Sequence, residues 1–76
     1  MTAIADKILA YMRNEYKNRL VNNPNMSDDS ARMFSIDEIC EACNLEHSTV
    51  AKETSNLKQY GCVQKWITGT IVLEED

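Results

Sequence analysis

The apolar residues between positions 46 and 61 recur at the spacing of an amphipathic helix. At about 100° per residue, Val50, Thr54 and Leu57 share one narrow stripe. The opposite side carries hydrogen-bonding side chains, one cation and no carboxylate: Ser48, Lys52, Ser55, Asn56 and Gln59. This pattern predicts a helix over 47–60 that is anchored to a small core and turns a polar face outward.

A shorter amphipathic helix is predicted over 36–43. Ser35 and Glu38 have the spacing of a capping box, in which each side chain satisfies a free backbone amide of the other residue. Asn44 follows at the left-handed stop, a conformation that asparagine tolerates better than most residues. The apolar positions that would face the core are Ile36, Ile39, Cys40 and Cys43.

The chain begins with a long helix, predicted over 3–21. Its apolar residues recur about every four positions: Ile4, Ile8, Met12 or Tyr11, Tyr16 and Leu20. Leu9, Tyr11 and Val21 lie off this line. The surplus indicates either a helix end that frays over the core or a surface for a second copy of the chain.

The segment 22–34 is predicted to be a loop. The run from Asn22 to Asn25 contains the proline that ends the first helix, because proline disfavours helical geometry in the residue before it. The centre of the segment, 26–31, allows two interpretations. It is either a mobile turn or one extra helical turn that starts at Ser27.

Two strands that form a hairpin are predicted after Gly61, over 63–67 and 70–73. Thr68-Gly69 lies between them, and glycine supplies the positive φ that a tight turn needs. A two-residue turn there would place Trp66 opposite Ile71 and Gln64 opposite Leu73. Both faces of this hairpin are half apolar, so the pattern leaves open which one covers the core.

The order of these elements resembles the winged helix-turn-helix family. The residues that carry the resemblance are Leu45-x-x-Ser48-Thr49-Val50, then Leu57, then Gly61-Cys62-Val63. The resemblance implies an α+β fold, mostly α, with a three-helix core and a two-stranded C-terminal wing over 62–74. It also implies a short strand at 32–34 that pairs with the wing and brings Met33 or Phe34 to the core. It spans residues 1–76 as a single domain.

Members of this family include many transcriptional regulators, so the resemblance implies a small regulator that reads double-stranded DNA. The helix over 47–60 would be the recognition helix in the major groove, and the wing would contact the DNA backbone. The residues that the resemblance assigns to DNA are His47, Ser48, Thr49, Lys52, Ser55 and Asn56 on the helix, and Lys65, Thr68 and Thr70 on the wing.

The charge balance opposes this function in part. The net charge is −4, which disfavours approach to a polyanion. Segment 47–73 is nevertheless basic, since Lys52, Lys58 and Lys65 against Glu53 give +2, and segment 13–19 of the first helix adds another +2. We therefore keep a second hypothesis, a protein-interaction module with aromatic anchors among Trp66, Tyr60 and Tyr11.

Chain length, the distribution of apolar residues and the number of cysteines limit the classes of protein to which this chain can belong. Seventy-six residues allow one core, and the chain has neither a leader pattern nor an apolar run of the roughly 20 residues that span a bilayer. Three cysteines, an odd number, favour a reducing compartment. We expect a soluble cytoplasmic protein without membrane attachment.

The cysteines and the histidine also allow a metal site. Cys40 and Cys43 have the spacing of half a zinc site, which Cys62 and His47 could complete. The pair falls inside a helix, however, at positions that its buried stripe needs, so packing is the favoured role. No catalytic set of residues is apparent. We predict no metal, no cofactor and no enzymatic activity.

Overall fold

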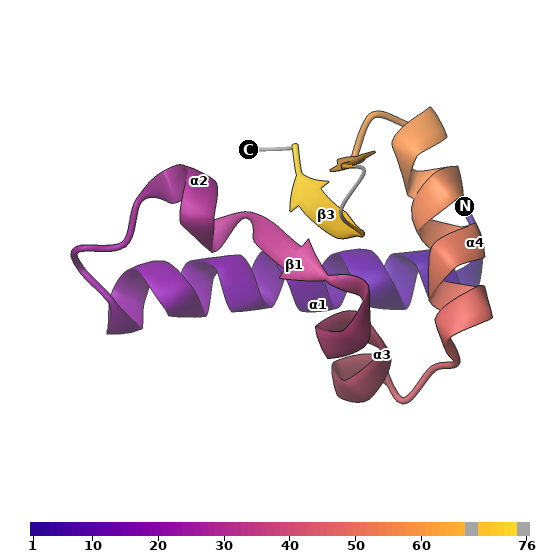
Figure 1. The fold of residues 1–76 in the computed structure, drawn as a ribbon, viewed down its shortest axis with the longest axis horizontal. Coiled ribbons are helices and arrows are strands. Elements are labelled where there is room, and N and C mark those ends of the chain that lie inside the picture. The colour runs from indigo at the N-terminus through magenta and orange to yellow at the C-terminus, as the bar shows by residue number, and fades with distance from the viewer. Residues whose placement is uncertain (67–68, 75–76) are drawn as a thin grey trace.

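The computed structural model describes residues 1–66 and 69–74. In these ranges it contains helices α1 (Ala3–Asn22), α2 (Asp28–Ala31), α3 (Ile36–Cys43) and α4 (His47–Gln59), and strands β1 (Met33–Ser35), β2 (Val63–Lys65) and β3 (Thr70–Leu73). α1 runs along the longest axis of the molecule, the sheet lies beside it, and α4 crosses near the beginning of α1 (Figure 1). The predicted α+β, mostly α class is confirmed.

The first half of the chain is more ordered than its sequence indicates. The hydroxyl of Thr2 caps α1 by accepting from the amide of Ala5 at 3.0 Å. The predicted loop over 22–34 is wrong in part, because it contains α2 and most of β1. Ser27 starts α2, its hydroxyl accepting from the amide of Ser30 at 3.1 Å. This confirms the interpretation of one extra helical turn.

The turn between α3 and α4 forms as predicted. The amide of Glu38 donates to the Ser35 hydroxyl at 3.1 Å, and the amide of Ser35 donates to the Glu38 carboxylate at 2.8 Å. Asn44 has φ 55° and ψ 52°, the left-handed conformation. α4 then ends at Gln59, where Gly61 with φ 75° lets the amide of Cys62 donate back to the carbonyl of Leu57 at 3.0 Å.

The sheet is antiparallel, with β3 between β1 and β2. Val63 pairs with Leu73, Lys65 pairs with Ile71, and the amide of Trp66 donates to the carbonyl of Thr70 at 2.8 Å. The predicted pairing of Trp66 with Ile71 and of Gln64 with Leu73 is therefore wrong by one residue. The observed register places Val63, Ile71 and Leu73 on the core face together, which the predicted register does not.

The core lies where α1, α3, α4 and the sheet meet. Phe34 is 1% exposed and reaches this core from β1, which begins one residue later than the predicted strand at 32–34. Leu9 is also buried, so it is a core residue and no part of a surplus apolar surface. Val21, by contrast, is 77% exposed at the far end of α1. The buried cluster comprises Ala5, Ile8, Leu9, Met12, Phe34, Ile39, Cys43, Val50, Leu57, Val63, Ile71 and Leu73.

Side chains close the outer edge of β1. Arg19 donates to the carbonyl of Met33 at 2.7 Å and to the Glu38 carboxylate at 3.1 Å, and its guanidinium lies 4.2 Å from the centre of the Phe34 ring. Glu38 in turn accepts from the amide of Ser35. Arg19 was counted in the basic charge of the first helix. Its side chain is only 17% exposed, however, and it binds groups of β1 and α3.

A polar cluster fastens α2 to α1. Asp28 accepts from the hydroxyl of Tyr16 and, at 2.7 Å, from Nε of Arg32, whose guanidinium also lies 4.6 Å from the centre of the Tyr16 ring. The Tyr16 hydrogen bond, and after it Arg32, lower the pKa of Asp28 below its ordinary value of 3.8. The carboxylate form is therefore the one that the folded state favours.

We expect this cluster to make stability depend on acid pH. A depressed carboxyl pKa contributes stability above the unfolded value, 3.8, and loses it as the pH falls through the folded value. Asp28→Asn should thus lower the urea midpoint at pH 7, and the difference from wild type should shrink below about pH 4. The neighbouring Asp29→Asn variant is the control and should leave the midpoint at pH 7 unchanged. An Asp28→Asn deficit that stays constant from pH 7 to pH 2.5 would contradict the prediction.

Candidate nucleic-acid interface

α4 is anchored as its sequence predicts. Val50, Thr54 and Leu57 are fully buried, and the Thr54 hydroxyl donates to the carbonyl of Val50 at 2.8 Å, so no polar atom of this stripe is left unsatisfied. The opposite face of α4 is open to solvent. It carries Ser48, Lys52, Ser55 and Gln59, all of which are exposed.

Lys65 joins the strand β2 to this helix. Its ammonium donates to the Ser55 hydroxyl at 2.9 Å and to the carbonyl of Ala51 at 3.2 Å. Ser55 itself donates to the carbonyl of Ala51 at 3.0 Å. Lys65 and Ser55, predicted to contact DNA from two separate elements, are thus in direct contact. The positive charge of β2 lies on the surface of α4.

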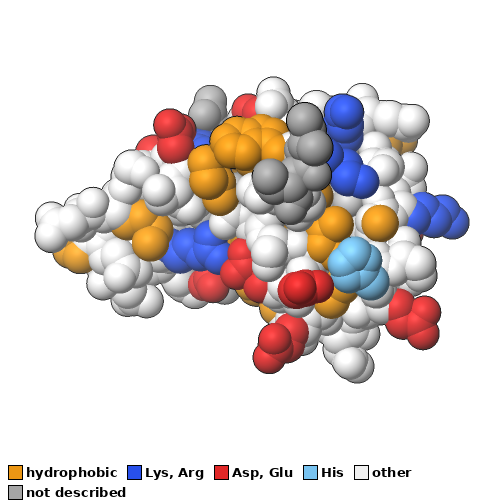
Figure 2. Space-filling view, viewed as in Figure 1, with side chains coloured by type: hydrophobic (Ala, Val, Ile, Leu, Met, Phe, Trp, Pro, Cys, Tyr) orange, Lys and Arg blue, Asp and Glu red, His pale blue; other side chains and the backbone are white. Residues whose placement is uncertain are grey.

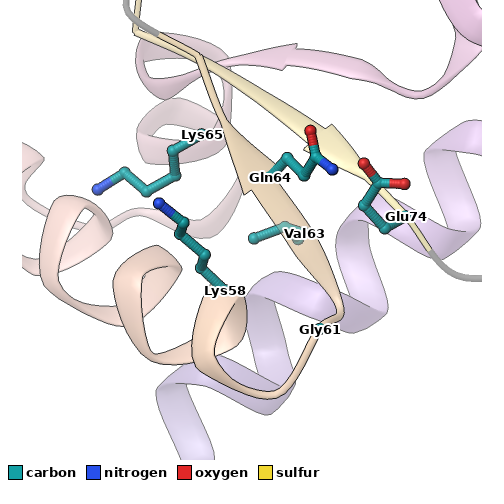
Figure 3. A pocket seen from close by; sticks show the side chains of 6 residues that line it. All are labelled: Lys58, Gly61, Val63, Gln64, Lys65 and Glu74. Atoms are coloured by element: carbon teal, nitrogen blue, oxygen red, sulfur yellow. The ribbon is translucent and has the colours of Figure 1, made fainter.

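Lys58 extends this positive region, although it was not among the predicted site residues. A hollow of about 610 Å³ separates the end of α4 from β2 and is lined by Lys58, Gly61, Val63, Gln64, Lys65 and Glu74. Lys58, from the last turn of α4, and Lys65, from β2, extend side by side on the α4 side of β2, whereas Gln64 and Glu74 lie on its other side (Figure 3). The sequence predicted the hairpin but not the packing of β2 against α4, which brings the two lysines together.

Asn56 lies on the flank of α4 and not at the centre of its exposed face. Its amide donates to the Glu53 carboxylate at 2.8 Å, and the Thr2 hydroxyl donates to the same carboxylate at 3.0 Å. Glu53 is only 5% exposed. The one carboxylate of α4 is therefore covered by the start of α1, and one amide hydrogen of Asn56 is already used.

The beginning of α4 has the opposite charge. Glu46 precedes the helix and makes no side-chain hydrogen bond to its free amides. His47 is exposed, with its Nε2 3.6 Å from a carboxylate oxygen of Asp37 in α3. Ser48 is exposed and Thr49 half-buried in the same turn. Figure 2 shows basic side chains over the later part of α4 and acidic ones around its start.

The cysteines pack in the interior or against it. Cys43 is a member of the core, and its burial raises the pKa of the thiol. Cys40 and Cys62 are half-buried against that core, which confirms the predicted packing role. Among the described residues, no three histidine, cysteine or acidic side chains lie close enough to hold a metal ion.

The fold thus places most of the residues that were predicted to contact DNA on one side of the molecule. Ser48, Lys52 and Ser55 share the exposed face, Lys65 joins it from β2, and Asn56 lies on its flank. Thr68 lies outside the described residues. No helix in the described part of the chain has the length and apolarity to cross a membrane. Comparison with protein-family models, curated proteins and solved structures gave no match to this chain.

Proposed function

We propose that this chain is a winged helix-turn-helix protein that binds double-stranded DNA through α4 and acts as a small transcriptional regulator. One observation carries the proposal. The exposed face of α4 presents hydroxyls, an amide and two lysines, Lys52 and Lys58, and Lys65 of β2 lies against it, while the only carboxylate of α4 is buried. Donors and acceptors of this kind read base edges in the major groove, and the lysines neutralise phosphates.

The charge distribution refines the proposed contacts. Lys52 would reach a guanine edge or a phosphate, and Asn56 would present its carbonyl oxygen because its amide nitrogen is bonded to Glu53. The carboxylates of Glu46 and Asp37 disfavour a phosphate at the very start of α4. Phosphates would therefore lie on the side of Lys58 and Lys65. With a net charge of −4, the affinity should be modest and sensitive to salt.

Duplex binding is tested by titrating labelled DNA of mixed sequence at low salt and following fluorescence anisotropy. Removing two charges from the proposed face, in Lys52→Ala with Lys58→Ala, should weaken binding at least about tenfold and lower the salt slope by about 2. The matched control removes two exposed lysines from α1, Lys7→Ala with Lys17→Ala, and should cost less than about threefold. The stoichiometry of the titration also tells whether one or two copies bind, as a dimer through α1 would require.

Two outcomes would reject the proposal. One is the absence of any binding by the wild-type protein at low salt. The other is an equal loss in the two double variants, which would mean a diffuse charge effect and no defined face. Selection of bound duplexes from random or genomic pools would then establish whether the wild-type protein prefers a particular sequence.

A further inference from the structure

The face of the sheet that turns away from the core carries an apolar patch. Because side chains alternate along a strand, burial of Phe34, Ile71 and Leu73 turns their neighbours outward. Trp66 is 47% exposed, and Met33 and Val72 beside it are half-buried. These three residues line a hollow of about 220 Å³ together with Asp29, Arg32 and Glu74. Figure 2 shows hydrophobic side chains over the sheet with acidic ones beside them.

The charge at the edge of this hollow is negative. Arg32 is the one cation among the described residues that line it, and its guanidinium already bonds the Asp28 carboxylate at 2.7 Å and the carbonyl of Leu73 at 3.2 Å. Asp29 and Glu74 are exposed, and neither has an ion-pair partner among the residues that the structure describes. Two carboxylates therefore line the hollow without an ion pair to any of the described residues.

We propose that this patch docks a basic segment of a partner protein, with an arginine or lysine side chain stacked on the indole of Trp66. Among the aromatic side chains, tryptophan gives the most favourable stacking surface for a cation. The aliphatic stem of the guest packs on Met33 and Val72, and its charge is received by Asp29 and Glu74. The hollow holds roughly seven water volumes, which suits one long side chain and is below the range of cofactor pockets.

The surroundings argue against two other occupants. Nucleic acid is disfavoured because the uncompensated carboxylates repel phosphates, in contrast to the lysines on α4. Addition of a partner strand at β1 is blocked, since Arg19 occupies the outward carbonyl of Met33 and Glu38 occupies the outward amide of Ser35. The partner must therefore approach the face of the sheet and not its β1 edge.

Trp66 is the only tryptophan of the chain, so its fluorescence reports directly on this patch. Three short peptides are titrated at low salt: one of alternating arginine and valine, one with citrulline in place of arginine, and one with glutamate. The arginine peptide should shift the Trp66 emission and bind about fivefold to tenfold more tightly than the citrulline peptide, which has the same shape without the charge. The glutamate peptide should not bind.

Two charge-reversing substitutions test whether the arginine peptide binds at this patch. Glu74→Lys should weaken binding of the arginine peptide about fivefold to tenfold. Glu41→Lys makes an equal charge change on the exposed side of α3 and should change the affinity for this peptide less than about twofold. Equal binding of the arginine and citrulline peptides, binding of the glutamate peptide, or no emission change with any peptide would overturn the proposal. So would an emission that depends on protein concentration alone, which indicates a second copy on the patch. Asp29→Lys, which changes the carboxylate of this hollow that does not line the hollow beside α4, should weaken the arginine peptide but not the binding of duplex DNA, so the two proposals fail independently.

Discussion

A Phe34→Ala variant is expected to lose about 3–5 kcal/mol of unfolding free energy. Phe34 is buried where β1, α1 and α3 meet. Its ring lies edge-on to the ring of Tyr11, with 5.8 Å between the ring centres, and the Arg19 guanidinium lies over its face. Truncation leaves a cavity and removes both ring contacts. Because a chain of this length has about 4–11 kcal/mol in total, the variant should lose between about a quarter and all of its stability.

Urea unfolding followed by circular dichroism measures this loss. Val21→Ala is the matched control, since Val21 is an exposed apolar residue of α1 and its truncation should change the free energy by less than about 0.5 kcal/mol. A Phe34→Ala protein whose urea midpoint equals that of wild type would mean that β1 does not close the core.

The second large effect is expected from Arg19→Met, which should cost about 2–3 kcal/mol. Methionine keeps most of the packing volume but leaves the carbonyl of Met33 without a donor and the Glu38 carboxylate without a cation. Arg19→Lys should recover only part of the loss, because an ammonium cannot reproduce the fork that reaches both acceptors.

Lys17→Met is the comparison for Arg19→Met. It removes the same charge from the same helix at an exposed position, so it should change stability by less than about 0.5 kcal/mol. If the two variants unfold at the same urea concentration, the loss is one of net charge and the edge of β1 is not held by Arg19.

Local sequence signals predicted much of this fold. The capping box of Ser35 and Glu38, the left-handed Asn44 and the extra turn from Ser27 each depend on a few neighbouring residues, and each is present. The same holds for the stripe of Val50, Thr54 and Leu57, because a helix period fixes which side chains share a face.

Contacts between distant segments could not be predicted in this way. The two-residue turn suggested by Thr68-Gly69 gave the wrong hairpin register, since packing of Val63 and Leu73 against the core decides it. Arg19 was counted only in the basic charge of the first helix, because nothing local links it to Glu38. Likewise, Asn56 was assigned to the exposed face of the helix, since its hydrogen-bonding to Glu53, which Thr2 covers, exists only in the folded chain.

The hydrogen bond from Thr2 to Glu53 joins residues 51 positions apart. Because this bond needs α1 already packed against α4, it should form late, after the rest of the core has assembled. The flank of α4 would then be the last part of the proposed DNA-binding face to reach its native structure. A protein shortened at its beginning, or carrying a fusion ahead of Thr2, would present an altered α4 even with its core intact.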